Sequence, residues 1–585
     1  MFALRFVFSN YGKHKYLYLF SLLLSAVSSV MVIIVPSYIR KIIDNVIIGG
    51  EYNLLISYVI AIILFTLIRT VLRYFMIIFI ETASQKMILR VRERCFHSIT
   101  NQEQSFFSHR TSGDIMTRLT ADIDTVYHTA AWISFNVVDA VVMFITAIVY
   151  LCTINLWFTL CLVVACPLVG IISFVMSKKI QPMYEALRDK LSHLNVVAKE
   201  NIEGMRIVKS STNEKFELEK FTKINNEYRD ENIKTNNVYF EFFPYIEGIA
   251  QAVPILTILA GAFIIILSSG NVLSIGDLIA FSTLSGTIMG PMRMLGMIIN
   301  DYSKFLASAK KVIDVYYGKP LILKSTNGIR KNERYNGIIE FLNVSFKYEN
   351  EYTLKNISFF VNSGETVVIM GGTGSGKTTI ANLIPRLYDV NEGQILIDGI
   401  DVRKYDLEEM RSNIAVATQD IFIFSDSIAA NIAFSNPSLS REEIESFARA
   451  ADAHNFILNT ENGYDTVVGE KGVGLSGGQK QRLALARALA NKPSVLILDD
   501  TTSALDYNTE RFVNEQMNEL PYKPTKIIIA SRISSAKNAD KILYLENGEI
   551  VEMGTHEELL AKRGYYYEVY KMQVLDNDTE NGGVL

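Results

Sequence analysis

Cysteine and net charge are both scarce in this chain of 585 residues. Its four cysteines, Cys95, Cys152, Cys161 and Cys166, fall in the first third, and three of them lie inside or beside apolar runs. A disulfide framework or a zinc site needs regularly spaced cysteines, so neither is expected. The 57 Lys and Arg residues nearly balance the 61 Asp and Glu residues, giving a formal charge of −4. This balance excludes a general nucleic-acid binder, which would carry a marked basic excess.

Hydrophobic residues, by contrast, make up 49% of the chain, and its mean hydropathy is +0.20. Residues 127–177 contain Asp139 as their one charge, and residues 242–292 contain only Glu247 and Asp277. Each stretch is long enough for two membrane spans of ~20 residues. With two earlier apolar runs, the sequence predicts six spans, near residues 16–39, 54–80, 134–153, 157–177, 246–267 and 277–299.

The distribution of Lys and Arg predicts that both termini are cytoplasmic in a multi-pass protein of the cell membrane. Basic residues precede the first span and follow the second, fourth and sixth spans, whereas the loops after the third and fifth spans carry none. Arg40 and Lys41, after the first span, run against this rule.

Two connections, residues 81–126 and 178–241, are far longer than a membrane turn requires. They are charged, favour helix and contain little Gly or Pro, so we expect long cytoplasmic helical arms. Separate soluble insertions are the alternative, but neither connection has enough apolar residues for its own core. After about residue 318 short β-rich runs alternate with helical segments, which is typical of an α/β domain with a largely parallel sheet. We therefore expect a transmembrane domain at 1–318 and a soluble domain at 319–585.

The soluble domain contains a phosphate-binding motif. The predicted strand 366–370 leads into Gly371-Gly372-Thr373-Gly374-Ser375-Gly376-Lys377-Thr378, and a helix begins near Thr379. This is a full G-x-x-x-x-G-K-T loop between a strand and a helix, the context that confirms the motif. The glycines let backbone N–H groups surround phosphates, Lys377 reaches the outer phosphates, and the Thr378 hydroxyl can bind Mg²⁺.

Two further motifs follow this loop. Residues 494–498 form an apolar strand that ends in Asp499, which suits the second metal-coordinating position of such nucleotide sites. Between the two lies Leu475-Ser476-Gly477-Gly478-Gln479, which resembles the signature sequence of ATP-binding cassette (ABC) proteins. With six spans before it, the chain resembles a half-transporter of the type I ABC exporter family. The implied fold is a six-span helical transmembrane bundle with cytoplasmic arms, followed by a P-loop ATPase domain with a RecA-like core and a helical subdomain.

The resemblance implies roles for further residues. Tyr348 matches the aromatic residue that stacks on adenine, and Gln419 matches the glutamine that approaches Mg²⁺ and links the nucleotide to the arms. Residues 469–472 and 503–506 match two loops at the dimer interface, and coupling helices are expected near 111–114 and 211–215. The expected ATP-binding residues of the chain's own site are Tyr348, Gly371, Gly372, Thr373, Gly374, Ser375, Gly376, Lys377, Thr378 and Thr379. Ser476, Gly477, Gly478 and Gln479 are expected to bind ATP in a partner's site, and Thr378, Gln419 and Asp499 to hold Mg²⁺.

Two positions depart from the family pattern. Members that hydrolyse ATP well carry Glu after the metal-coordinating Asp, but this chain has Asp500, whose side chain is ~1.5 Å shorter; a misplacement of ~1 Å can cost ~100-fold in rate. The family's histidine after the next strand corresponds here to Ser531. Ala417 and Thr418 precede Gln419, where a proline is usual. Together these changes predict a site that binds Mg-ATP and hydrolyses it slowly.

ATP in this family lies between the phosphate loop of one subunit and the signature of another, so a second half-transporter is required. We favour a heterodimeric multidrug-type exporter in which the partner supplies Glu and His, and in which this chain carries the degenerate site. A slow homodimer, a nucleotide-gated channel and a membrane sensor share every motif and stay open.

The substrate is poorly encoded. Aromatic residues around the fifth span suit an amphipathic drug, lipid or peptide, although side chains facing the lipid bilayer are the default there. Charged residues inside the spans are functional candidates. By depth, Glu247 is expected to pair with Arg293, with Arg69 and Arg73 as alternatives. A cation-binding role for Glu247, Glu241 or Asp139 is the other interpretation.

Overall fold

The computed structural model describes residues 2–268, 272–322, 328–331, 333–469, 472–501 and 507–581. The chain forms two compact units. The helical unit comprises Met1–Asn101 and Arg110–Lys319, and the α/β unit comprises Gln102–His109 and Pro320–Leu585.

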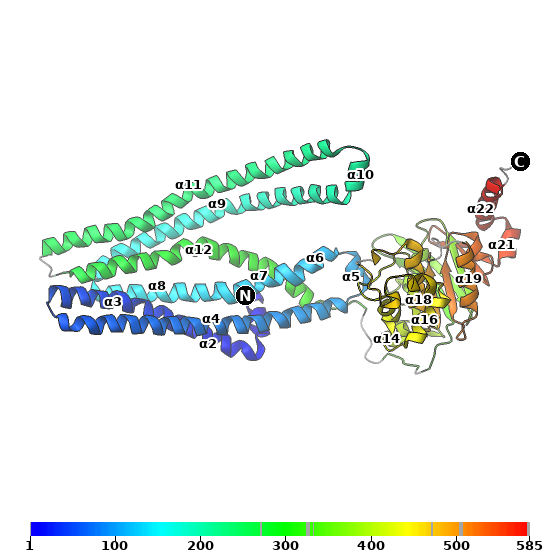
Figure 1. The fold of residues 1–585 in the computed structure, drawn as a ribbon, viewed down its shortest axis with the longest axis horizontal. Helices are drawn as coiled ribbons and strands as arrows, with labels where there is room; N and C mark the ends of the chain where they lie inside the picture. Colours follow the sequence, from blue (N-terminus) through cyan, green and yellow to red (C-terminus); the bar gives the residue numbers. More distant parts are fainter. Residues whose placement is uncertain are drawn as a thin grey trace. The chain divides into compact units, whose positions relative to one another are not determined.

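The helical unit is built from long helices (Figure 1). Three of them, α4, α9 and α11, contain 46, 48 and 55 residues, and α9 and α11 run side by side. At ~1.5 Å per residue each is about 70 Å long or more. The α-helices are α1 (Phe2–Asn10), α2 (Lys15–Val30), α3 (Ile34–Lys41), α4 (Leu55–Thr100), α6 (Ser112–Thr117), α7 (Ile123–His128), α8 (Ser134–Ile154), α9 (Leu156–Glu203), α10 (Met205–Ser210), α11 (Glu214–Ser268) and α12 (Ile275–Tyr316).

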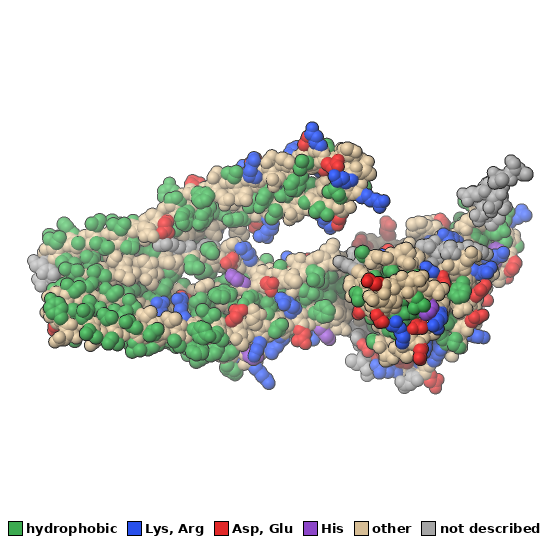
Figure 2. Space-filling view, in the orientation of Figure 1, with side chains coloured by type: hydrophobic (Ala, Val, Ile, Leu, Met, Phe, Trp, Pro, Cys, Tyr) green, Lys and Arg blue, Asp and Glu red, His purple; other side chains and the backbone are tan. Residues whose placement is uncertain are grey.

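Four helical segments of the described residues are long and apolar enough to cross a membrane: Gly12–Ile48, Tyr52–Thr100, Ser112–Ile154 and Glu214–Leu267. They contain four of the predicted spans, and the other two, 157–177 and 277–299, lie within α9 and α12. Hydrophobic side chains cover the end of the unit that carries α3, whereas charged side chains gather toward α10 (Figure 2). The helices of the spans therefore continue into the arms, so the arms are not separate soluble insertions.

Arg40, which runs against the expected charge distribution, has a partner beyond the fifth span. Its Nε lies 2.6 Å from Asp277 Oδ1, at the start of α12. Asp44, in the π-helical turn η3 (Ile42–Ile48), accepts hydrogen bonds from the Ser274 hydroxyl at 2.7 Å and the Gly276 N–H at 2.9 Å. The ends of the first and sixth helical segments are thus joined by charged contacts.

Among the charges inside the spans, the expected Glu247–Arg293 pair stays a prediction, whereas one alternative partner needs correction. Arg73 Nη2 lies 3.5 Å from Asp139, which also accepts a hydrogen bond from Ser29, so Arg73 is not a partner of Glu247. Glu247 accepts from Gln251 at 2.8 Å. Arg69 Nε is buried without a hydrogen-bond partner, and Glu241 pairs with Lys179 at 3.5 Å. The side chain of Arg293 lies outside the described residues.

Two sheets form the α/β unit. A six-stranded sheet has the order β10-β9-β3-β8-β7-β6 and is parallel except at β10. Its strands are β3 (Thr366–Gly371), β6 (Ile414–Ala417), β7 (Val495–Asp499), β8 (Thr525–Ile529), β9 (Lys541–Glu546) and β10 (Glu549–Gly554). The second sheet is antiparallel, with order β2-β1-β4-β5, and consists of β1 (Ile339–Lys347), β2 (Tyr352–Val361), β4 (Glu392–Ile397) and β5 (Ile400–Asp401). The largely parallel sheet is confirmed. However, the β-rich runs that form β1 and β4, predicted as part of the same α/β pattern, belong to the antiparallel sheet.

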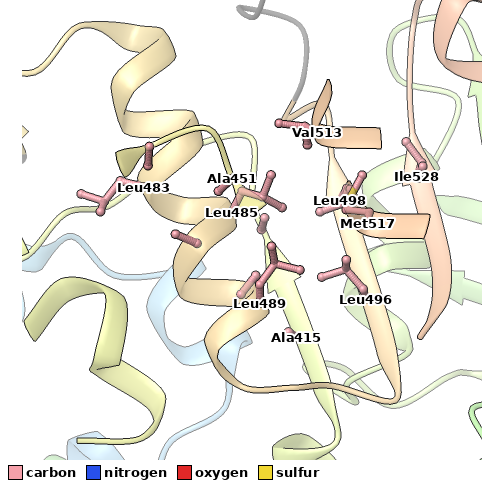
Figure 3. Close-up of a cluster of buried hydrophobic side chains, with 14 of the residues drawn as sticks. Ala415, Ala451, Leu483, Leu485, Leu489, Leu496, Leu498, Val513, Met517 and Ile528 are labelled. Carbon is pink, nitrogen blue, oxygen red and sulfur yellow. The ribbon is translucent and has the colours of Figure 1, made fainter. Parts of the chain in front are cut away.

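The parallel strands are buried on both faces, so alternate residues enter two cores. Ile369 and Ile497 pack toward the antiparallel sheet, whereas Leu496 and Leu498 face a cluster of helices. Figure 3 shows this second core, in which α18 (Gly477–Ala490) lays Leu485 and Leu489 against β6 and β7, with α19 (Tyr507–Asn518) beside them. The remaining helices are α5 (Gln104–Ser108), α13 (Lys377–Leu383), α14 (Leu407–Ser412), α15 (Ile428–Ile432), α16 (Arg441–Ala450), α17 (His454–Leu458), α20 (Ile533–Ala536), α21 (His556–Lys562) and α22 (Tyr565–Asn581).

Candidate functional site

The phosphate-binding motif forms the turn between β3 and α13, as the sequence predicts. Gly371, Gly374 and Gly376 have φ angles of +144°, +82° and +100°, a region that side chains with a Cβ rarely adopt. A Cβ on Gly371 would lie 2.1 Å from the Leu545 carbonyl oxygen, and one on Gly376 would lie 2.5 Å from Leu354 Cδ2. Residues 372–374 are exposed. The glycines are thus required by the course of the loop, which bends into a cradle at the start of α13.

Polar groups of the cradle are poised for an anion. Lys377 Nζ donates to the carbonyl oxygens of Gly371 at 2.9 Å and Gly372 at 2.6 Å. Burial lowers the pKa of Lys377, and the nearby carboxylates of Asp499 and Asp500 partly offset this effect. The Ser375 hydroxyl is buried without a hydrogen-bond partner. An orphaned buried donor beside a partly buried cation at a helix N-terminus fits the phosphates of a nucleotide.

Thr378 and Asp499 meet at the end of the central strands. The Thr378 hydroxyl donates to Asp499 Oδ1 at 3.3 Å, joining the first turn of α13 to the end of β7. The Asp499 side chain is buried, and this burial raises its pKa above the usual range, while the Thr378 hydrogen bond opposes the shift. A hydroxyl and a carboxylate are oxygen ligands of the kind that Mg²⁺ prefers, so these two residues fit the ion.

The two departures from the family pattern lie at the ends of neighbouring strands. Asp500 follows β7 with φ +50°, and its N–H donates to the Ile529 carbonyl of β8 at 3.1 Å. Ser531 follows β8 two residues later and is exposed. Adjacent strands lie ~4.8 Å apart, so both residues flank the same edge of the sheet as Lys377. The first position therefore lacks the longer carboxylate of a glutamate, and the second lacks the imidazole of a histidine.

Tyr348 lies at the entrance to α13. Its hydroxyl is 3.2 Å from Thr379 Oγ1, and its ring makes edge contacts with Phe346 and Tyr388, with centroids 4.9 and 5.2 Å away. The side chain is 44% exposed. The remaining open face can stack on an adenine base.

The signature forms the N-terminus of α18. Ser476 is the N-cap residue, and it forms a reciprocal capping box with Gln479, whose Oε1 accepts the Ser476 N–H at 2.8 Å. Ser476 and Gly477 are exposed, and Gly478 is partly exposed. The free N–H groups of this 14-residue helix therefore point outward from an exposed positive end, which suits a phosphate brought from outside the chain.

Gln419 lies in an exposed loop after β6, and a contact that the sequence did not predict supports the segment that follows it. Arg487 of α18 donates to the carbonyl oxygens of Asn431 and Phe422, both at 2.8 Å, and to Asn431 Oδ1 at 2.7 Å. The guanidinium also lies against the ring of Phe424. Arg487 thus ties the signature helix to the glutamine loop, a long-range contact with no sequence motif of its own.

The tip of the first arm belongs to the α/β unit. Residues 102–109, including α5, pack with that unit, whereas Thr111–Asp114, expected as the coupling segment, starts α6 of the helical unit. Glu103 accepts the Leu321 N–H at 2.9 Å, and His109 lies 3.8 Å from Glu349, next to Tyr348. Within the α/β unit, residues 102–109 therefore lie close to the residue that precedes Glu349 in the chain, Tyr348.

Several predicted interface residues cannot be placed. Glu470 and Lys471 of the loop before the signature, and residues 503–506, lie outside the described residues. The second expected coupling segment, near 211–215, forms the turn between α10 and α11, where Thr212 has φ +53°.

Comparison with known proteins agrees with both halves of the chain. Residues 18–292 match the family model of the ABC transporter transmembrane region, and residues 354–503 match the family model described as ABC transporter. The chain is 34% identical to the Uncharacterized ABC transporter ATP-binding protein YknU of Bacillus subtilis, over 97% of this chain and 96% of YknU. It is 32% identical to the ATP-dependent lipid A-core flippase of Escherichia coli K12, over 94% of each chain. A bacterial Atm1-family ABC exporter with ATP bound has a similar fold, with a TM-score of 0.79 at 27% identity over 96% of this chain and 98% of the exporter.

Proposed function

This chain belongs to the type I ABC exporter family as a half-transporter, and from this premise we propose that it is the subunit of a heterodimer that carries the slowly hydrolysing ATP site. The family couples ATP to transport across a membrane. The proposal concerns the division of labour between two subunits, and the observation that carries it is the pair Asp500 and Ser531.

The binding half of the site is complete. Tyr348 stacks on adenine, the 371–376 loop and Lys377 surround the phosphates, and Thr378, Asp499 and Gln419 hold Mg²⁺. The bound ion neutralises charge on the phosphates. The buried Ser375 hydroxyl and the Lys377 ammonium supply donors that a triphosphate satisfies.

The hydrolytic half is weakened at two points. Asp500 withdraws the carboxylate by one methylene from where a glutamate base would hold the attacking water, and such a base acts only within hydrogen-bond reach. Ser531 offers a hydroxyl in place of an imidazole, with less reach and no positive charge for the γ-phosphate. Binding without fast turnover is the expected outcome.

The signature at the start of α18 is intact, and it serves the other site. In a heterodimer, Ser476, Gly477, Gly478 and Gln479 close over nucleotide held by the partner's phosphate loop. A partner with Glu and His at the two altered positions then has one fully equipped site. One fast and one slow site follow from a pair of unequal subunits.

Transport is proposed to follow from movement passed along the chain between the two units. ATP binding closes the two ATPase domains, and the arm tip 102–109, which contacts Glu349 beside Tyr348, carries this movement into α4. Both termini are proposed to be cytoplasmic. The substrate is proposed to be an amphipathic drug, lipid or peptide, in keeping with a relative named as a lipid A-core flippase.

The test is to express this chain with a half-transporter that carries Glu and His at the two positions and to measure ATPase activity of the purified pair. Replacing the partner's glutamate by glutamine should abolish turnover, whereas Asp500→Asn in this chain should change it less than about threefold. Equal losses from the two substitutions would contradict the proposal. Fast turnover by this chain alone would instead support a homodimeric exporter.

A further inference from the structure

The loop that carries Ser531 is held by a side chain from the C-terminal helix. Gln573 of α22 donates from Nε2 to the Ser531 carbonyl oxygen at 2.9 Å, and its Oε1 accepts the Ile533 N–H at 2.9 Å. One amide group thus forms hydrogen bonds with two backbone groups of the loop between β8 and α20. Ile533 is the first residue of α20, so its N–H has no partner within that helix.

We propose that Gln573 is a positioning residue for the nucleotide site, which fixes the loop carrying Ser531 so that α22 must be docked for the site to distinguish ATP from ADP. This inference rests on the proposed function, because it takes residue 531 as the position that faces the γ-phosphate. The sequence does not predict it, since Gln573 lies 42 residues from Ser531 in the chain.

The helix that presents Gln573 is anchored at its start. The Glu552 carboxylate of β10 accepts the N–H groups of Tyr565 and Tyr566, both at 2.9 Å, at the start of α22. Tyr566 is fully buried, and its hydroxyl lies 2.7 Å from His556 Nδ1 of α21. Gln573 therefore lies about two helical turns beyond the anchored start of α22.

The loop is also held at its two ends independently of Gln573. Upstream, the Ile529 carbonyl of β8 accepts the Asp500 N–H. Downstream, the Ser535 hydroxyl donates to the buried carboxylate of Glu510 at 2.5 Å. Loss of the Gln573 amide thus releases the Ser531 carbonyl and the Ile533 N–H, while β8 and α20 stay in place. The effect is expected on residue 531 and not on the fold.

The experiment uses the full chain with Asp500→Glu and Ser531→His, substitutions that restore the family residues. Gln573→Ala is compared with Lys571→Ala, an exposed neighbour on α22. ATP and ADP affinities are measured with Mg²⁺ by displacement of a fluorescent nucleotide, together with the thermal transition. We expect Gln573→Ala to reduce the preference for ATP over ADP about five- to tenfold, with ADP affinity and the transition unchanged, and Lys571→Ala to have no effect.

Gln573→Glu gives a second measurement. It keeps the acceptor for the Ile533 N–H but sets a carboxylate against the Ser531 carbonyl, so its loss of preference should match or exceed that of Gln573→Ala. The same substitution with native Ser531 should have a smaller effect, because serine reaches the γ-phosphate poorly. An unchanged ATP preference in both Gln573 variants, or an equal loss of ATP and ADP affinity, would overturn the inference. A restored chain that binds ATP but hydrolyses it no faster than the native chain would contradict the proposed function and not this inference. The two outcomes are distinguishable because the ratio of ATP to ADP affinity is measured without ATP hydrolysis.

Discussion

Thr378 and Asp499 are joined by a hydrogen bond of 3.3 Å, although 121 residues separate them in the chain. The bond joins the phosphate-loop helix to the end of β7. Burial of the Asp499 carboxylate there lowers the stability of the folded protein. Sites prepared for ligands commonly sacrifice stability in this way.

Asp499→Asn is therefore expected to stabilise the nucleotide-free protein while removing its response to Mg-ATP. The raised pKa of Asp499 means that its contribution to stability is present below the usual value of 3.8 and is lost as pH rises through the folded-state pKa. The amide removes this cost, worth about 1 kcal/mol at pH 7. Thermal unfolding with and without Mg-ATP measures both effects, with Asp420→Asn, on the exposed loop after β6, as the control. A transition of Asp499→Asn that Mg-ATP raises as in the native chain would contradict this reading.

Arg40 and Asp277 should be energetically coupled. With the Nε–Oδ1 contact at 2.6 Å and the Asp277 side chain only 10% exposed, Arg40→Met leaves a poorly solvated carboxylate and should cost about 1–3 kcal/mol. Asp277→Asn in the same chain should recover much of that loss. A double-mutant cycle on the thermal transition measures the coupling. Lys41→Met, which removes the adjacent positive charge, is the matched control, and additive losses from Arg40 and Asp277 would refute the pairing.

Docking of α22 should weaken as pH falls. Burial lowers the pKa of His556 below 6.5, with a further decrease from Lys537 and an opposing increase from Glu557. Its contribution to stability is thus present above pH 6.5 and is lost as pH falls from 6.5 through the folded-state pKa, because protonation places a charge on a partly buried imidazole. Hydrogen exchange at residues 565–573 between pH 7.5 and 5.5, corrected for the intrinsic rate, checks this. His556→Gln should flatten the dependence, and a persistent pH effect in that variant would assign it to another group.

Arg487→Lys should separate ATP binding from transport. Lysine keeps the charge but cannot reproduce three fork-like hydrogen bonds to Asn431 and Phe422, so about 2 kcal/mol of local stability is lost in the segment after Gln419. We expect transport and ATPase activity to fall several-fold with little change in ATP affinity. Arg449→Lys, at an exposed ion pair with Glu445, should leave all three unchanged. A parallel fall in ATP affinity would contradict the assignment.

Local patterns in the sequence were sufficient for much of the fold and of the site. The phosphate loop and the strand ending in Asp499 depend on neighbours within a few residues, and each forms where it is predicted. The long arms also follow from local composition, because α4, α9 and α11 continue without a break.

Contacts between distant segments could not be predicted in the same way. The Arg73–Asp139 pair depends on the relative rotation of α4 and α8, and depth along a span does not encode this rotation. The separation of β1 and β4 into a second sheet depends on pairing partners, since a short apolar run is equally suited to either sheet. Arg487 and Gln573 carry no motif because they act on backbone atoms far away in the chain.

Asp500 and Ser531 are proposed to make this chain's own site slow, and the ATPase activity of the purified chain by itself is the decisive measurement. The native chain should turn over slowly, and Asp500→Glu with Ser531→His should raise kcat by about 10- to 100-fold with little change in KM for ATP. Lys377→Ala in the restored chain should abolish the gain. Fast turnover by the native chain, or a restored chain that binds ATP equally well but hydrolyses it no faster, would contradict the account.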